Sequence, residues 1–232
     1  MLSDADAQWL KAHQPELEQV EDGIVKGVIH FAASLVSGQL VIDPDPASLV
    51  KADYARNYRT DSYEVEINWN GPQPKLKEIG GRIRAAAIRH RKEPRDLHIN
   101  DDGTACVAAD QDLEVSRRAG LTLPLYIESY VVPFLYGESY FEDSGTWPWN
   151  ELSHGPWGLL DWLGRKPQIT SRDVADTLRD LRRRIGDAET KRLISQRCRG
   201  HRPCPCGSGR KARNCHPYVK TAIARIRSEL NG

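Results

Sequence analysis

Four residues of the types that bind transition metals lie within 13 positions near the end of the 232-residue chain. The segment CPCGSGRKARNCH, residues 204–216, contains Cys204, Cys206, Cys215 and His216. Four thiolate or imidazole ligands favour a tetrahedral Zn²⁺ ion, and they leave no open coordination position, so the ion would be structural. The two glycines of the segment allow so short a loop to fold back on itself. The alternative is a set of unpaired or oxidised thiols.

This segment resembles the SEC-C zinc motif, named for the C-terminus of the bacterial preprotein translocase motor. The matching residues run as C-P-C-G-S-G from Cys204 to Gly209, followed by Lys211 and the closing pair Cys215-His216. The resemblance covers only residues 202–217. It implies a zinc-binding module that docks partners such as proteins or ribosomes. The neighbouring Cys198 and His201 are expected not to bind the ion.

The fifth cysteine, Cys106, is the only one in the first 197 residues. It follows the turn Asp101-Asp102-Gly103, and side chains next to such turns are commonly accessible. A lone cysteine more often packs in a core, and the neighbouring carboxylates oppose formation of an activated thiolate. Modest nucleophilicity is nevertheless enough to exchange an acyl group that is already held as a thioester.

The residues around Cys106 resemble the ubiquitin-conjugating enzyme family, in which His-Pro-Asn precedes a G-x-x-C segment that bears the thioester cysteine. The matching residues are His98-Ile99-Asn100 and Gly103-Thr104-Ala105-Cys106. The later stretches TLPLYIESYVVPFLYGESYF and GTWPWNELSHG are similar to the bacterial branch of this superfamily, which accompanies ubiquitin-like proteins, activating enzymes and isopeptidases in conjugation and defence operons. The resemblance runs over residues 1–164.

The resemblance implies a role for each of these residues. Cys106 would accept the carboxyl terminus of a ubiquitin-like protein from an activating enzyme and pass it to an amine. Asn100 would support the loop or stabilise the oxyanion, and His98 would hold the loop by hydrogen bonding. Ile99 stands where the family has proline, and the spacing from Asn100 to Cys106 is shorter than in the eukaryotic pattern. His154 is a weaker catalytic candidate, with packing as the alternative.

The resemblance implies an α+β fold, a ubiquitin-conjugating-enzyme-like antiparallel sheet with flanking helices, followed by a small helical tail that carries the zinc site. Hydrophobic periodicity predicts helices at residues 4–20, 124–135, 170–185 and 219–230 and strands at residues 25–36, 63–69 and 75–84. Pro15 should weaken or shorten the first of these helices, Pro133 should kink or end its own, and Gly186 should break the third. The tryptophan-rich stretch after residue 144 is interpreted as an irregular apolar cap. The expected domains are residues 1–164, a helical linker at 165–199, and the zinc module with a final helix at 200–232.

The net charge of +1 hides a strong division along the chain. Residues 165–232 hold 18 Lys and Arg against 6 Asp and Glu, which is +12, whereas the remainder holds 15 against 26, which is −11. Such asymmetry suggests an appended module with its own partner, either nucleic acid or an acidic protein. The alternative is that the arginines only solvate helix faces.

Three functional hypotheses follow. The first is a bacterial ubiquitin-like conjugating enzyme whose partners are the modifier, its activating enzyme, and a protein bound by the zinc module. The second is a catalytically silent scaffold of the same fold, and the third is a zinc-dependent nucleic-acid or ribosome-binding adaptor. The chain has no run of 18 apolar residues and no secretory signal at its start, so we expect a soluble cytoplasmic protein without membrane partners.

Overall fold

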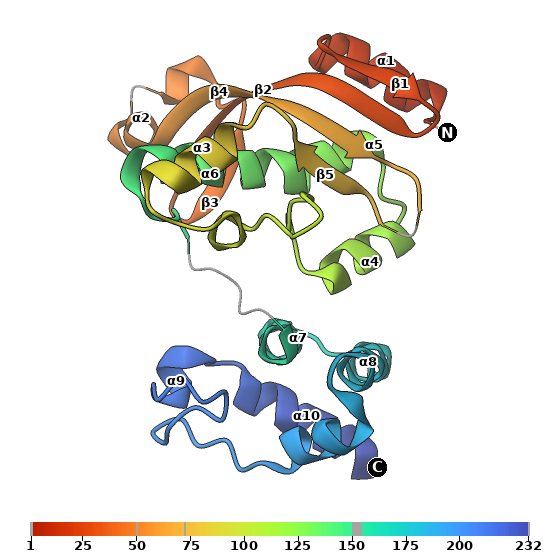
Figure 1. The fold of residues 1–232 in the computed structure, drawn as a ribbon, viewed down its shortest axis with the longest axis vertical. Helices are drawn as coiled ribbons and strands as arrows, with labels where there is room; N and C mark the ends of the chain where they lie inside the picture. Colours follow the sequence, from red (N-terminus) through yellow and green to blue (C-terminus); the bar gives the residue numbers. More distant parts are fainter. Residues whose placement is uncertain (1, 50, 72, 150–154, 232) are drawn as a thin grey trace. The chain divides into compact units, whose positions relative to one another are not determined.

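The structure is a computed structural model that describes residues 2–49, 51–71, 73–149 and 155–231. The chain folds as two compact units, Met1–Asn150 and Glu151–Gly232. Figure 1 shows that the first unit is built around a β-sheet and that the second consists of helices and an extended loop. The expectation of an α+β fold with an antiparallel sheet and flanking helices is confirmed.

Helix α1 (Asp4–His13) begins the first unit and ends well before residue 20. The shortening expected from Pro15 is thus confirmed. Ser3 and Asp6 form a capping box, in which each side chain accepts the backbone N–H of the other residue. Pro15 has no N–H to donate to a continuing helix. The residues after it therefore leave the helix and pair as strand β1 (Leu17–Glu21).

A five-stranded antiparallel sheet forms the centre of this unit. Its main order is β1-β2-β4-β5, and β3 pairs with β2; the remaining bounds are β2 (Ile24–Val36), β3 (Gln39–Ile42), β4 (Tyr58–Asn68) and β5 (Lys75–Glu78). Strands β2 and β4 pair from Ile24 opposite Asn68 to Ser34 opposite Tyr58. The three strands expected from the sequence are confirmed, although β5 ends at Glu78 and helix α3 follows.

Short helices connect and cover the sheet. In chain order they are η1 (Pro46–Ser48), α2 (Ala52–Asn57), α3 (Arg82–Arg89), η2 (Pro94–Leu97), α4 (Asp110–Arg118), α5 (Leu123–Tyr126), η3 (Ile127–Val131) and α6 (Val132–Ser144). Pro124 lies in the first turn of α5, as expected for a helix start.

Pro133 does not end the helix in which it lies. It occupies the first turn of α6, directly after η3, whose hydrogen bonding is that of a π-helix. A proline ring clashes with the carbonyl four residues earlier in an α-helix, and the wider π turn relieves this contact. The chain therefore continues from α5 through η3 into α6 without a break.

One face of the sheet carries the core. Tyr63, Val65 and Ile67 are buried on this face, and they alternate with the more exposed Glu64 and Glu66, as the period of two predicts. Helix α6 lies along the sheet in Figure 1. It contacts this face where the Tyr63 hydroxyl lies 3.1 Å from Ser139 Oγ.

The outer edge of β2 is closed by several different groups. Strands β1 and β3 pair with its two ends. Between them, the side-chain amide of Gln14 accepts the backbone N–H of His30 at 2.9 Å and donates to its carbonyl at 2.8 Å. The Glu16 carbonyl accepts the Val28 N–H, and the Ala32 carbonyl accepts the Asp43 N–H. These hydrogen bonds occupy both backbone groups of His30, the Val28 N–H and the Ala32 carbonyl within the chain.

The second unit contains helices α7 (Gly155–Arg165), α8 (Ser171–Ser195), α9 (Ala212–Cys215) and α10 (Val219–Asn231). A capping box of Thr170 and Asp173 starts α8. Gly186 has φ 77° and ψ 164°, so it interrupts α8, as the sequence predicts. Helix α7 packs against both α8 and α10.

This unit starts before the expected boundary at residue 164. Leu159, Leu160 and Leu163 of α7 are buried, and the helix packs on α8 and α10, so residues 165–199 are part of a compact unit. The tryptophan-rich stretch is accordingly not one irregular cap. Its described part contributes Trp147 and Trp149 to the core of the first unit and a regular helix to the second.

Among the described residues, no helix combines the length and the apolar composition needed to cross a membrane.

Candidate metal centre and cysteine hairpin

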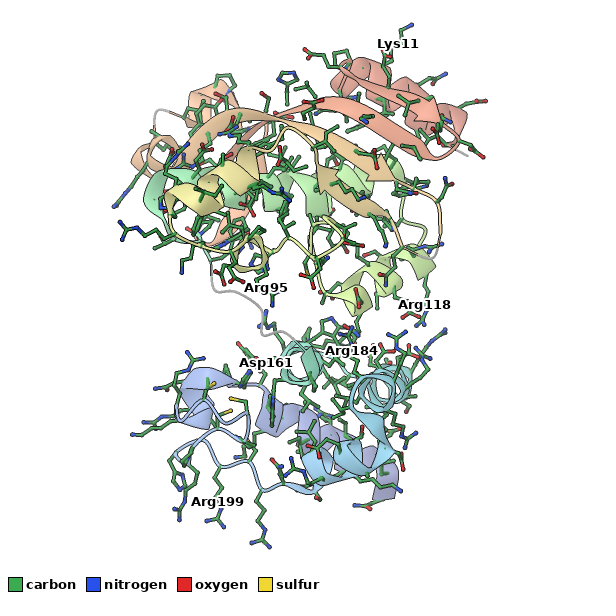
Figure 2. All side chains as sticks on the ribbon, in the orientation of Figure 1. Lys11, Arg95, Arg118, Asp161, Arg184 and Arg199 are labelled. Atoms are coloured by element: carbon green, nitrogen blue, oxygen red, sulfur yellow. The ribbon has the colours of Figure 1, made fainter. Side chains whose placement is uncertain are left out.

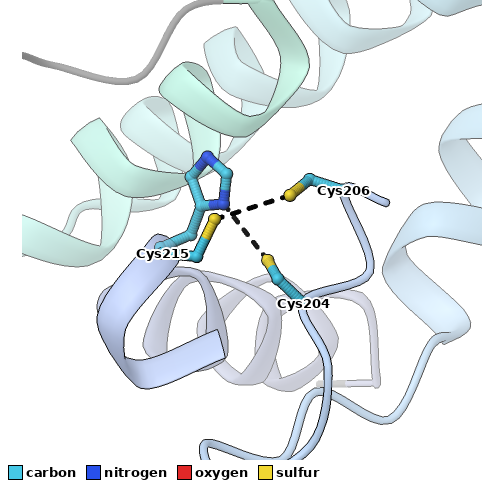
Figure 3. A group of neighbouring side chains, drawn as sticks. Cys204, Cys206 and Cys215 are labelled. Carbon is cyan, nitrogen blue, oxygen red and sulfur yellow. Dashed lines mark hydrogen bonds between the residues drawn. The ribbon is translucent and has the colours of Figure 1, made fainter. Parts of the chain in front are cut away.

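The four metal-binding residues expected from the sequence come together at one point of the second unit (Figure 3). The ligand atoms of Cys204, Cys206, Cys215 and His216 all lie within 4.8 Å of one another. Cys204 Sγ is 3.2 Å from His216 Nδ1, and the sulfurs of Cys206 and Cys215 are 3.6 Å apart. Sulfurs on a tetrahedral Zn²⁺ lie about 3.8 Å apart, given Zn–S bonds of about 2.3 Å. The cluster therefore has the size and donor set to hold one metal ion, and its cysteines form no disulfide.

A tight backbone loop positions these ligands. The Cys204 N–H donates to the Arg210 carbonyl at 2.7 Å, and Pro203 and Lys211 form an isolated antiparallel bridge. The turn between the bridged residues needs Gly207 and Gly209, whose φ angles are 83° and 73°. The short helix α9 then directs Cys215 and the residue after it back toward the first two cysteines.

The electrostatics of the cluster suit metal binding. Burial raises the pKa of Cys204. Burial also acts to raise the pKa of Cys206, but hydrogen bonds with Ser208, and further ones with Cys204 and Cys215, together lower that pKa. Burial lowers the pKa of His216, which favours the neutral imidazole that a metal requires. An ion would replace the proton that Cys204 otherwise keeps at neutral pH.

Helix α7 supports the metal loop from one side. Asp161 is buried and accepts the Tyr218 N–H at 3.3 Å. A Cβ added to Gly164 would lie 2.1 Å from the Tyr218 carbonyl, so this glycine allows the two backbones to approach. The rings of Trp157 and His216 are 5.6 Å apart. The loop is thus fixed to a helix far from it in sequence.

Cys198 and His201 lie outside the group of ligand atoms that converge in the described part of the chain. Cys198 is half-buried, and burial raises its pKa. His201 is exposed. Their expected role as bystanders agrees with this arrangement.

Cys106 of the first unit ends a short hairpin. Its N–H donates to the His98 carbonyl at 2.7 Å, and the Asn100 N–H donates to the Thr104 carbonyl at 2.8 Å. The Ala105 N–H donates to the Leu76 carbonyl at 2.8 Å, which attaches the hairpin to β5. The Cys106 side chain is half-buried, with its sulfur 3.8 Å from the Ala108 carbonyl. The thiol is therefore neither in the hydrophobic core nor fully exposed.

Asn100 and Asp102 stabilise the tip of this hairpin. Asn100 Nδ2 donates to Thr104 Oγ1 at 3.0 Å, and one carboxylate oxygen of Asp102 accepts both the N–H and the hydroxyl of Thr104. These hydrogen bonds lower the pKa of Asp102. The contacts of the Asn100 amide agree with the loop-supporting role expected for it, and the oxyanion role stays a prediction.

His98 holds the other side of the hairpin. Its backbone is left-handed, with φ 57°, and its ring meets the ring of Trp147 edge-on, with centroids 4.7 Å apart. Trp147 occupies space left by Gly137 of α6, where an added Cβ would lie 2.1 Å from the indole. The Cys106 hairpin is thereby packed against α6. His154, the weaker candidate, lies outside the described residues.

Sequence reasoning missed a partly buried polar network on the core side of the sheet. Arg82 of α3 binds both carboxylate oxygens of Asp61, at 2.5 and 2.7 Å, and donates to Glu142 at 2.7 Å. The guanidinium also lies over the ring of Tyr63. Nearby Glu138 is 1% exposed, and neither of its oxygens has a hydrogen-bond partner among the described residues. The sequence signal for this group was Glu138, an acid inside the otherwise apolar run that forms the first turns of α6.

No family model, curated protein or solved structure matches the chain.

Proposed function

We propose that the protein is a ubiquitin-like conjugating enzyme that carries its modifier as a thioester on Cys106. The observation that carries the proposal is the position of this thiol. It lies half-buried at the end of a hairpin whose backbone is fixed to β5, directly outside the core. Support also comes from the antiparallel sheet and flanking helices, which agree with the architecture that the sequence resemblance implies.

The proposed reaction has two acyl transfers. The Cys106 thiolate attacks the thioester carbonyl between the modifier and the activating enzyme; a new C–S bond forms, and the enzyme's cysteine leaves and takes up the proton. An acceptor amine then attacks the Cys106 thioester, a C–N bond forms, and Cys106 leaves as a thiol. The activating enzyme supplies the energy by consuming ATP. Neither transfer requires an oxidant or a strongly activated thiolate.

The chain's own residues would hold the thiol in place. The carbonyl of His98 binds the backbone of Cys106, and Asn100 and Asp102 order the turn through Thr104. Trp147 packs on the His98 ring. An ordered hairpin lowers the entropic cost of aligning the thiol with an incoming carbonyl.

In the second unit, the proposed ion is Zn²⁺, held by Cys204, Cys206, Cys215 and His216 in a structural role. The similarity of this loop to the SEC-C motif and its three-cysteine, one-histidine donor set support zinc over harder cations, which prefer oxygen ligands. The ion would fix the loop, and the module would recruit the substrate or another protein partner of the conjugation reaction.

Transfer assays with purified components test the proposal. The full chain is mixed with a cognate activating enzyme, its ubiquitin-like protein and ATP, and products are separated with and without thiol reductant. We expect a reductant-sensitive adduct with the unaltered chain, a reductant-resistant oxyester with Cys106→Ser, and no adduct with Cys106→Ala. Cys198→Ser is the matched control, because it removes another half-buried thiol, and it should react like the unaltered chain.

A thiol-reactivity measurement makes a negative result interpretable. Cys106 should be alkylated by iodoacetamide in the folded, metal-loaded protein, as read by peptide mass spectrometry. Alkylation of Cys106 without any adduct would contradict the conjugating-enzyme proposal and favour the catalytically silent scaffold. A thiol that alkylates only in denaturant would contradict both the accessible hairpin and the carrier role.

A further inference from the structure

The segment that contains the metal loop lacks acidic residues over a long stretch. Residues 190–228 include 11 Lys and Arg and no Asp or Glu. Charge of one sign over this length generates a local potential that a near-neutral whole-chain charge conceals. Whether such cations serve a partner depends on how many are already neutralised within the protein.

Six cations of α8 form ion pairs with carboxylates of the same helix. Arg172 and Arg179 pair with Asp176, Arg183 pairs with Asp180, and Arg182 pairs with Asp187. Lys191 and Arg192, at the end of the helix, pair with Asp187 and Glu189. These residues fit the alternative in which arginines only solvate a helix face.

The cations beyond α8 differ. Arg227 is occupied by the backbone carbonyls of Ile194 and Gln196. None of the remaining eight forms an ion pair with a described residue, and all are exposed: Arg197, Arg199, Arg202, Arg210, Lys211, Arg213, Lys220 and Arg225. Arg199, labelled in Figure 2, extends away from the helices of its unit. We name these eight residues the basic set.

The metal loop gives the basic set a fixed framework. Arg202 and Arg210 flank the Pro203–Lys211 bridge, and the carbonyl of each accepts a backbone hydrogen bond that closes the loop. Arg213 lies within α9, two residues before Cys215. The spacing of these cations is therefore set by the same backbone that brings the ligands together.

We propose that the basic set binds the phosphate backbone of duplex nucleic acid, without reading its base sequence. Six of its eight members are arginine, whose planar guanidinium binds phosphate through paired N–H groups. Among the described residues 190–228, Tyr218 is the one exposed Tyr, Trp or Phe side chain, and stacking on single-stranded bases needs several. The lack of exposed large apolar groups within the loop also disfavours insertion into a lipid surface.

This binding is independent of Cys106 and can be measured separately from the conjugation activity. The experiment uses the full, zinc-loaded chain and a fluorescein-labelled DNA duplex about two helical turns long, followed by fluorescence anisotropy over a range of salt concentrations. We expect an affinity that falls steeply with salt, because each neutralised phosphate releases a counterion. Polyglutamate and vesicles of phosphatidylglycerol serve as alternative anionic probes.

Two triple variants with the same change in net charge distinguish binding by the basic set from attraction by net charge alone. The test variant is Arg199→Gln, Arg202→Gln and Arg213→Gln, and the control is Arg172→Gln, Arg179→Gln and Arg183→Gln. We expect the test variant to bind the duplex at least about tenfold more weakly, with a log–log salt slope smaller by about 3, and the control to stay within about twofold. Both must retain their bound zinc, measured by elemental analysis.

Three results would overturn the proposal. The first is a lack of duplex binding by the unaltered chain at about 50 mM salt. The second is an equal loss of affinity in the two triple variants, which would indicate attraction by net charge alone. The third is tighter binding to polyglutamate or to the vesicles than to the duplex, which would assign the basic set to an acidic protein or a membrane surface.

Discussion

Replacement of Glu138 by glutamine should make the first unit markedly less sensitive to alkaline pH. The carboxyl group is buried without a hydrogen-bond partner among the described residues. Burial, followed by the negative charges of Glu78 and Glu142, raises its pKa from 4.5 to about 9. Glu138 is thus a neutral acid in the folded protein at pH values where the unfolded chain ionises.

The sign of the effect follows from proton binding. Between the two pKa values the folded state holds a proton that the unfolded state releases, so the free energy of unfolding falls as pH rises. One pH unit within this window corresponds to about 1.4 kcal/mol. Keeping the Glu138 carboxyl protonated in the folded state therefore costs about 3 kcal/mol at pH 7. Through this group, the free energy of unfolding falls by about 4 kcal/mol between about pH 5 and about pH 8.

The assay is urea unfolding of the full chain at several pH values, read by hydrogen exchange and mass spectrometry of peptides from β4 and α6. Labelling pulses are adjusted for the intrinsic exchange rate at each pH. Glu138→Gln should show a flatter dependence on pH than the unaltered chain and should be more stable above neutral pH. Glu128→Gln, which alters an exposed carboxylate in η3, is the matched control. Parallel stability curves for Glu138→Gln and the unaltered chain would refute the reasoning.

Three further perturbations have defined outcomes. Arg82→Ala leaves two carboxylates without their main partner, so the free energy of unfolding of the first unit in urea should fall by about 2 kcal/mol or more. Arg89→Ala removes an exposed ion pair and should lower it by less than about 1 kcal/mol. Gly164→Ala gains helix propensity of about 1 kcal/mol, yet its Cβ would meet a backbone carbonyl at 2.1 Å, so the thermal midpoint of the second unit should fall; a rise would contradict the close helix approach. Cys215→Ser should lower bound zinc well below one ion per chain and reduce the helical circular dichroism of the second unit, with Cys198→Ser unchanged in both; equal zinc in the two variants would exclude the assigned ligand set.

The parts of the structure that the sequence predicted correctly depend on local patterns. The metal loop needs only ligand spacing and two glycines, so the residues themselves contain the necessary information. The alternation around Tyr63 reports one buried face of β4 in the same way. Both features are set within short local segments and do not require knowledge of distant partners.

The parts that escaped prediction depend on contacts between distant segments. The tryptophans and glycines around α7 indicate an irregular segment until α8 and α10 are present to bury Leu160 and Leu163. The burial of Glu138 follows from the way α6 lies on the sheet. No local pattern predicts that a carboxyl group will be enclosed there, because acids inside apolar runs usually face solvent.

The amide of Gln14 has a consequence for how the protein behaves at high concentration. By binding both backbone groups of His30, it acts as a substitute peptide unit at a gap in the β2 edge. An open stretch there could recruit an extended segment from a second molecule and begin aggregation. The Gln14 side chain, at the end of α1, therefore prevents this part of β2 from pairing with a strand of another molecule.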